Sequence, residues 1–330
     1  MKSNPNIVTI GGGTGTFVVL SGLKNYPVKL SAIVSMMDSG GSTGRLKDQL
    51  GVLPPGDLRQ ALVALSESDE IWRKLFTYRF ESGDLKGHNF GNIFLSALEK
   101  ITGSTQEAVE YATRVLQTRG DVIPVTLDNS SLCAVYEDGT SFDQESQIDE
   151  YFGKSKISKM FLKPNALINL DAKHAIERAD YIIFGPGDLY TSLLPNLLVQ
   201  GMPEILANLN TKKIFISNLM TRAGQTDDYK VSDFVNKIEE YMMGETLDYI
   251  LVNNEPFDKE IVKTYKEVDN AVPVVDDIEG DFYHEAKVIR TNLLSNTVFK
   301  PSKSDTLKRS LLRHDSEKLA ETLFKILSFK

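Results

Sequence analysis

Five consecutive residues near the start of the chain, Gly11-Gly12-Gly13-Thr14-Gly15, have the composition of a phosphate-binding turn. Glycine lets the backbone bend tightly and bring amide hydrogens toward an anion, and a following helix adds the positive end of its dipole. The full dinucleotide fingerprint is absent because Thr16 stands three residues after Gly13, and no lysine follows to make a P-loop. The turn predicts phosphate binding, and close packing between a strand and a helix is the alternative reason for its glycines.

Polar or glycine-rich segments also follow the other expected strands. Asp38 would accept hydrogen bonds from ribose hydroxyls, Asp188 would contact a ribose or hold Mg²⁺ through water, and Arg222 would bind a phosphate with two N–H groups. The alternative for each is a solvated loop, and we expect 38–44 to be flexible. The candidate binding residues in these segments are Asp38, Ser39, Gly40, Gly41, Ser42, Gly185, Gly187, Asp188, Asn218 and Arg222.

The segment Gly87-His88-Asn89-Phe90-Gly91-Asn92 places a histidine and two amides between glycines, just before an apolar run. His88 is the candidate acid, base or phosphate donor, with Asn89 and Asn92 as further binding residues, and a structural role is the alternative. Upstream, Asp57 and Arg59 admit two interpretations. They either belong to a site or mark a helix start, with Asp57 as N-cap and Arg59 in solvent.

These segments require a parallel sheet to bring them together. Helical periodicity over Phe17–Leu23 and again between the later strands indicates a doubly wound, mostly parallel α/β sheet of the Rossmann-like class. We expect one nucleotide-binding domain over 1–330, with a helical insertion at about 54–117 and loops that meet at one sheet edge to form one site. The expected parallel strands are Ile7–Ile10, Leu30–Val34, Tyr181–Phe184, Lys213–Ser217 and Tyr249–Asn253.

Two regions are less regular. Val122–Thr126, Leu132–Tyr136 and Ile157–Leu162 resemble strands of a partly antiparallel section. In the tail, Leu319, Leu323, Ile326 and Leu327 share one face of a predicted helix, which we expect to pack on the sheet.

Composition narrows the class of protein. The chain has 330 residues, of which 41% are apolar and 25% are charged, values typical of a folded globular protein. A net charge of −8 without a basic run argues against a nucleic-acid partner. The single cysteine, Cys133, forms no internal disulfide. Because no signal peptide or apolar membrane span is evident, we expect a cytoplasmic protein without membrane insertion.

Six motifs taken together resemble the bacterial gluconeogenesis-factor family, the YvcK-like proteins, which share a fold with the CofD-like phospholactate transferases. The resemblance covers nearly the whole chain. The motifs are 11–15, 38–44, Pro55-Gly56-Asp57-Leu58-Arg59, 87–92, Gly185-Pro186-Gly187-Asp188-Leu189-Tyr190-Thr191-Ser192 and Arg313-His314-Asp315.

The resemblance implies a cytoplasmic regulator needed for cell shape during gluconeogenic growth, which binds a nucleotide sugar such as UDP-N-acetylglucosamine. It implies Tyr265 and Arg313 as contacts of the nucleotide sugar, although Tyr265 could equally be a packed side chain. Cell-wall-synthesis or regulatory proteins are the implied partners. The alternative is a Mg²⁺-dependent phosphotransferase that uses His88, Asp188 and Arg222, and bound NAD is a third option.

Several questions stay open at this level. They are the identity of any metal or catalytic residue, the physiological nucleotide, homo-oligomer formation, and regulation by phosphorylation at Ser302, Ser304 or Thr306.

Overall fold

The computed structural model describes residues 4–296 and 311–328, so the three candidate phosphorylation sites lie outside the described residues. Its centre is an eight-stranded sheet with the order β10-β11-β9-β8-β7-β1-β2-β3. All neighbouring strands in it are parallel except β10 and β11. The strands are β1 (Asn6–Gly11), β2 (Lys29–Val34), β3 (Asp121–Pro124), β7 (Tyr181–Phe184), β8 (Lys212–Ile216), β9 (Tyr249–Asn253), β10 (Phe282–Tyr283) and β11 (Ala286–Thr291).

The strand order reverses between β1 and β7. The chain moves outward from β1 through β2 to β3, and then from β7 through β8 and β9 to β11 on the other side. This arrangement confirms the mostly parallel α/β class expected from the alternating pattern. In such sheets, ligands bind beyond the carboxyl ends of the strands at the point of reversal.

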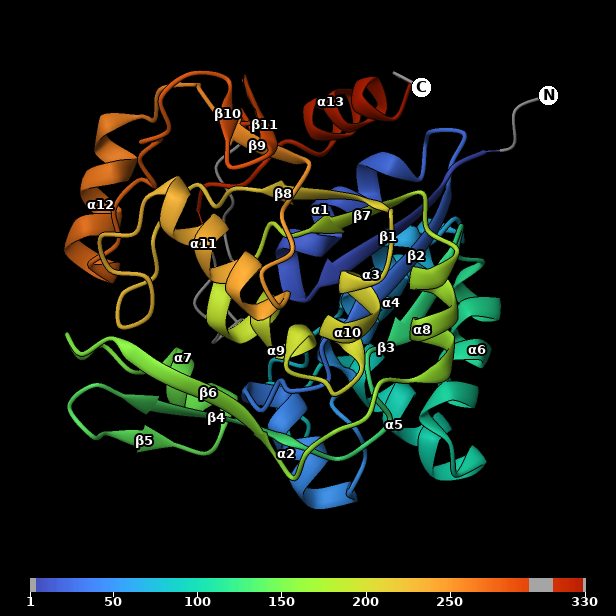
Figure 1. The fold of residues 1–330 in the computed structure, drawn as a ribbon. Coiled ribbons are helices and arrows are strands. Elements are labelled where there is room, and N and C mark those ends of the chain that lie inside the picture. The colour runs from blue at the N-terminus through green and yellow to red at the C-terminus, as the bar shows by residue number, and fades with distance from the viewer. Residues whose placement is uncertain (1–3, 297–310, 329–330) are drawn as a thin grey trace.

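Helices cover both faces of this sheet (Figure 1). Helix α1 packs against α3 and α13, while α9 contacts α10 and α11 and α10 contacts α8. None of the described helices has the length and apolar character needed to cross a membrane. The helices outside the insertion are α1 (Gly13–Leu23), α2 (Gly41–Leu50), α7 (Glu145–Asp149), α8 (Leu170–Glu177), α9 (Leu194–Leu197), α10 (Met202–Ala207), α11 (Val231–Tyr241), α12 (Lys259–Asp269) and α13 (Ser316–Ser328), with a π-helical turn at Leu189–Leu193.

The helical insertion is present, as expected. It contains α3 (Pro55–Leu65), α4 (Glu70–Thr77), α5 (Phe90–Thr102) and α6 (Thr105–Leu116). A helix does begin at this segment, as the helix-start interpretation expects, but its roles for Asp57 and Arg59 are both wrong. Pro54 holds the N-cap position, Asp57 lies inside the first turn of α3, and Arg59 is only 8% exposed. Its Nε donates to Asn92 Oδ1 at 2.8 Å, so α3 and α5 are joined by a buried polar contact.

The expectation of a flexible loop over 38–44 is wrong in its second half. Helix α2 begins at Gly41, and Ser42, Thr43 and Leu46 are buried in it. The small residues allow this close packing, because a Cβ on Gly44 would overlap the carbonyl of Ser39. Tertiary packing here overrides the weak helix preference of a Ser-Gly-rich sequence.

A second, three-stranded antiparallel sheet has the order β5-β4-β6. Its strands are β4 (Ser131–Tyr136), β5 (Ser141–Phe142) and β6 (Ile157–Lys163). The antiparallel section was thus expected, but Val122–Thr126 was placed in it wrongly, since β3 pairs in parallel with β2. The larger apolar core includes residues of both sheets, among them Ile183 and Leu132.

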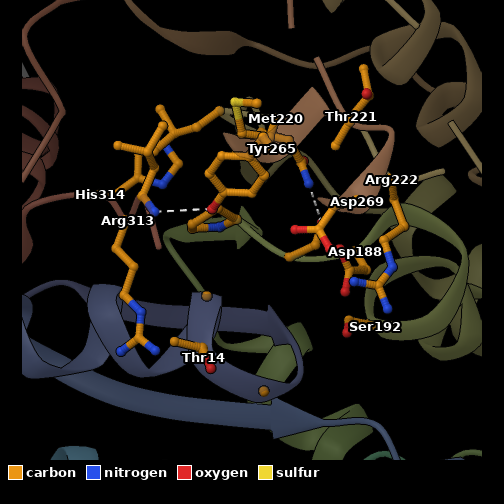
Figure 2. A pocket seen from close by; sticks show the side chains of 18 of the residues that line it. Thr14, Asp188, Ser192, Met220, Thr221, Arg222, Tyr265, Asp269, Arg313 and His314 are labelled. Atoms are coloured by element: carbon orange, nitrogen blue, oxygen red, sulfur yellow. Dashed lines mark hydrogen bonds between the residues drawn. The ribbon is translucent and has the colours of Figure 1, made fainter. Parts of the chain in front are cut away.

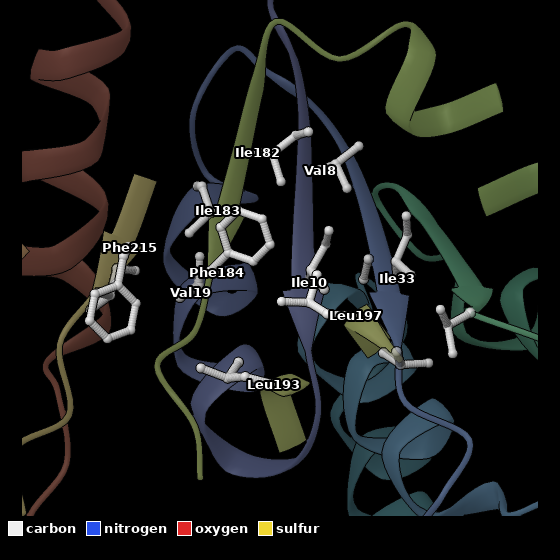
Figure 3. Packing of buried hydrophobic residues seen from close by; sticks show 14 of the residues in the cluster. Val8, Ile10, Val19, Ile33, Ile182, Ile183, Phe184, Leu193, Leu197 and Phe215 are labelled. Carbon is white, nitrogen blue, oxygen red and sulfur yellow. The ribbon is translucent and has the colours of Figure 1, made fainter. Parts of the chain in front are cut away.

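The core of the main sheet consists of β-branched and aromatic side chains from its central strands (Figure 3). Val8, Ile10, Ile33 and Phe184 are each about 1% exposed or less. The tail helix α13 buries Leu319 and Leu323, as its periodicity predicts. It packs against α1 through Gly22, where a Cβ would overlap Ser316, and its buried side chains belong to the same apolar core as the strands of the main sheet.

Candidate functional site

A pocket of about 250 Å³ lies beyond the carboxyl ends of β1, β7 and β8. The segments Gly12–Gly15, Pro186–Asp188 and Asn218–Ala223 form its floor and sides. Tyr265 and Asp269 of α12 and the segment Leu312–His314 close it from above. Parallel strands present their carboxyl ends at one sheet edge, which explains why three loops that are distant in the sequence meet here.

The glycine turn is shaped by close contacts. The amide of Gly13, where α1 begins, donates to Asp57 Oδ1 at 2.9 Å. A Cβ on Gly12 would overlap the Asp57 carboxylate, and a Cβ on Gly15 would overlap the carbonyl of Pro186. Packing therefore accounts for two of these glycines. Because the first amides of a helix have no intrahelical partner, Thr14 and Gly15 retain the amides best placed to meet an anion.

Opposite charges face one another in the pocket wall. Arg222 Nη2 forms an ion pair with Asp149 Oδ2 at 2.7 Å, and both Asp149 and Asp188 line the pocket. Burial raises the pKa of the Asp188 carboxyl, and Arg222 opposes this rise. The positive charge of Arg222 is therefore partly balanced by the carboxylates of Asp149 and Asp188. Arg222 contributes less net positive charge to the pocket than an unpaired arginine would.

Tyr265 and Arg313, the two residues implied by the family resemblance, both line the pocket. Tyr265 is 5% exposed, and its hydroxyl accepts a hydrogen bond from the amide of Leu312 at 3.0 Å. It also packs in a small apolar cluster with Leu219 and Ala271. Figure 2 shows Arg313 extending from the C-terminal segment toward Thr14 in the glycine turn. Tyr265 thus has a packing role in addition to its place in the wall.

A second polar cluster, centred on Ser42 and His88, lies outside the pocket lining. Ser42 Oγ and His88 Nδ1 are 3.1 Å apart, and the amide of Asn89 donates to Ser42 Oγ at 3.3 Å. Asn92 Nδ2 donates to Thr43 Oγ1 at 3.4 Å. Burial, with the charges of nearby arginines, lowers the pKa of His88. These contacts join α2 to the start of α5.

Acidic groups gather near this cluster. The amide of Ser39 donates to Glu145 Oε2 at 3.2 Å, and the amide of Gly40 donates to Asp38 Oδ1 at 2.9 Å. Burial raises the pKa of Asp38. Burial, together with Asp38 and Asp149, raises the pKa of Glu145 well above its ordinary value. Within residues 4–296 and 311–328, no group of three or more His, Cys, Asp or Glu is arranged to hold a metal ion.

The candidate residues that the sequence assigns to one site do not all line this pocket. The candidates that line the pocket are Gly12, Gly13, Thr14, Gly15, Gly187, Asp188, Asn218, Arg222, Tyr265 and Arg313. The candidates that do not line it are Gly11, Asp38, Ser39, Gly40, Gly41, Ser42, His88, Asn89, Asn92 and Gly185. Whether any of them binds a ligand stays a prediction.

Sequence reasoning missed several lining residues, namely Asp149, Phe152, Ser192, Met220, Asp269 and His314. Asp149 and Asp269 come from helices that carry no glycine-rich signal, and only the fold brings them to this edge. His314 stands next to Arg313 within a quoted motif, so the motif itself was the available signal.

Comparisons with known proteins agree with this architecture. A family model described as 2-phospho-L-lactate transferase CofD matches residues 7–294. A protein named gluconeogenesis factor from Bacillus subtilis is 40% identical over 329 residues, covering 99% of each chain. One of the same name from Halalkalibacterium halodurans is 39% identical over 320 residues, covering 96% of this chain and 95% of that one.

A crystal structure of a UPF0052 family member from Bacillus halodurans superposes with a TM-score of 0.88 at 37% identity. The match covers 98% of this chain and 99% of that one. The family match spans most of the chain, and the named relatives cover nearly its full length. The chain therefore belongs to the CofD family, among relatives that carry the name gluconeogenesis factor.

Proposed function

We propose that this chain is a cytoplasmic regulatory protein that binds a nucleotide sugar, such as UDP-N-acetylglucosamine, in the pocket beyond β1, β7 and β8. Its role would be to maintain cell shape during gluconeogenic growth. Cell-wall-synthesis or regulatory proteins would recognise the ligand-bound form. The observation that carries the proposal is that one pocket joins the first turn of α1 to Tyr265 and Arg313. The name of the relatives supports the regulatory role.

The two ends of the pocket differ in chemistry. At the end formed by the glycine turn, the helix dipole of α1 and the Arg313 side chain favour a negatively charged group such as a diphosphate. At the other end, Leu219, Met220 and Tyr265 offer apolar surface to a planar base or to sugar carbons. A nucleoside diphosphate has the matching order of polar and apolar parts.

The size of the pocket limits what it holds. Its volume of about 250 Å³ is below the ~300–1,000 Å³ of sites that enclose a drug-sized ligand. A nucleotide sugar is larger than this space, so part of it would extend beyond the pocket. A protruding group is available to a protein partner, which suits a regulator.

The test is thermal unfolding with UDP-N-acetylglucosamine, UDP-glucose, NAD and GTP, with and without Mg²⁺, followed by chromatography of each ligand. A ligand that binds only the folded state raises the melting temperature by mass action. We expect a rise with a UDP-sugar that is recovered unchanged. Arg313→Gln should reduce the rise, whereas Arg178→Gln, an exposed arginine outside this pocket, should not. No shift with any nucleotide would contradict the proposal.

The family model favours a second candidate, a Mg²⁺-dependent phosphotransferase that uses a nucleotide-activated donor. In this candidate, Asp188 and Arg222 would act together in the pocket wall. His88 bonds to Ser42 outside the lining, so the reaction would proceed without it. Consumption of the donor, abolished by Asp188→Asn with binding retained, would establish the transferase. If NAD binds and is recovered without a change in its redox state, NAD is a ligand of the pocket and not a cofactor for hydride transfer.

A further inference from the structure

Two buried side chains near the end of β8 each carry an unpaired hydrogen-bonding atom: Asn218 follows this strand by two residues, and His314 contacts the backbone of Ser217. Asn218 Oδ1 and His314 Nε2 are both buried in the pocket wall, and neither has a hydrogen-bond partner among the described residues. Asn218 Nδ2 donates to the carbonyl of Gly187 at 2.7 Å. That bond fixes the orientation of the amide, because a reversed side chain would set two oxygens against each other. The unpaired atom of Asn218 is therefore an acceptor.

The unpaired nitrogen of His314 is an acceptor as well. His314 is only 7% exposed. Burial lowers the pKa of its ring to about 4, so the ring is neutral near pH 7. A hydrogen bond with the Ser217 backbone raises the pKa, which is the effect of a carbonyl that accepts a ring N–H. Since Nε2 has no partner among the described residues, we assign the donating nitrogen as Nδ1. A neutral ring protonated at Nδ1 presents Nε2 as an acceptor.

Buried acceptors of this kind select for donors. Leaving a buried polar atom unpaired costs about 1–3 kcal/mol, and a ligand that supplies an N–H or O–H recovers that energy. Phosphate oxygens are acceptors and would be repelled by Asn218 Oδ1 and His314 Nε2. The diphosphate is therefore expected at the amides of the glycine turn and not against these two atoms. The donors of a nucleotide are its ribose hydroxyls and the N–H groups of its base.

We propose that His314 and Asn218 determine ligand specificity by accepting hydrogen bonds from the nucleoside part of the ligand, from a ribose hydroxyl or a base N–H. The proposal rests on the nucleotide-binding function given above. It also explains why the apolar cluster of Leu219, Tyr265 and Leu312 adjoins these acceptors, since a ribose or a base has apolar faces and polar edges. His314 and Asn218 would reject analogues that lack the donor.

The test compares affinities of the full chain for UDP-N-acetylglucosamine and three analogues by calorimetry. The analogues lack the ribose 2′-hydroxyl, lack the 3′-hydroxyl, or carry a methyl group on uracil N3. We expect the unaltered protein to bind at least one analogue about tenfold more weakly than the parent, the size of one lost bond to a buried acceptor. A hydroxyl analogue identifies ribose as the donor, and the N-methyl analogue identifies the base.

Variants assign the effect to a residue. His314→Leu removes the acceptor and should bind the parent ligand about tenfold more weakly, with no further loss for the sensitive analogue. His314→Gln restores an acceptor at similar reach and should recover part of the affinity. Tyr136→Phe is the matched control. Its hydroxyl is also buried and has no hydrogen-bond partner in the described part of the chain, but it lies in β4, outside the pocket, so affinity should not change.

The outcomes separate this inference from the proposed function. If the unaltered protein binds UDP-N-acetylglucosamine and all three analogues equally, the inference is wrong and the proposed function stands. The same holds if the analogue penalty persists undiminished in His314→Leu. If no nucleotide binds, both are overturned. Measurements with analogues on the unaltered protein decide the question even if His314→Leu does not fold.

Discussion

The amide of Gly13 donates a hydrogen bond to Asp57 Oδ1 over 2.9 Å, which ties the first turn of α1 to α3. The two residues are 44 positions apart in the chain. The Asp57 carboxylate thus already accepts a hydrogen bond from one of the backbone amides of the glycine turn. A phosphate bound at that turn, as we propose, would meet the remaining amides beside a fixed negative charge, so a nearby cation such as Arg313 would be important for its binding.

Asp57→Ala should destabilise the fold by about 2 kcal/mol, the cost of losing a charge-assisted hydrogen bond to a partly buried amide. Asp57→Asn keeps an oxygen at the same place and should cost less than half as much. Urea unfolding followed by far-ultraviolet circular dichroism measures both. Equal stability of the alanine variant and the unaltered protein would show that this contact contributes nothing.

Gly15→Ala should destabilise the protein by about 1–3 kcal/mol despite the better helix propensity of alanine. The added methyl group would overlap the backbone carbonyl of Pro186, which cannot move without shifting the loop after β7. Affinity for a UDP-sugar should fall with it. Gly40→Ala is the control, because its Cβ would meet Asp38 Oδ1 at an ordinary 3.5 Å, and its effect should stay within about 0.5 kcal/mol.

Glu145→Gln should stabilise the protein near pH 8 and have a smaller effect near pH 4. Burial and the nearby carboxylates raise the pKa of Glu145 well above its ordinary value, so the folded state binds the proton more tightly than the unfolded state. Its contribution to stability therefore declines as pH rises above the ordinary carboxyl pKa. Glutamine still accepts from the Ser39 amide. The exposed neighbour Glu150→Gln should not show this dependence when unfolding is measured across pH.

His314 should make the unfolding free energy fall as pH decreases from about 6.5 to 4. Burial lowers its pKa to about 4, so in this range the unfolded state takes up a proton that the folded state does not. The difference corresponds to roughly 3 kcal/mol between the two ends of the range. His314→Gln removes this term, and urea titrations of both proteins at several pH values measure it. Parallel curves for the two proteins would show that the folded ring titrates normally.

The elements that could be predicted from the sequence are those encoded by neighbouring residues. Ile7–Ile10 and Tyr181–Phe184 are buried β-branched and aromatic runs, and each ends at a glycine, so β1 and β7 were recognisable with their loops. Ser104 caps α6 by accepting from the amide of Glu107, three residues later, at 3.3 Å, a local contact between neighbouring residues. Helix α2 was missed because Gly41 and Ser42 have weak helix preference, and burial against the rest of the protein decides their conformation.

The sequence alone determined the α/β alternation and the glycine turn, because strand and helix patterns and backbone bends depend on residues within a few positions of one another. The tertiary structure decided which polar residues share a space. His88 contacts Ser42 and does not line the pocket, Asp57 accepts a hydrogen bond from Gly13, and His314 contacts the backbone of Ser217 after β8. These neighbours are separated by tens of residues or more, and only the packing of strands and helices sets the distances between them.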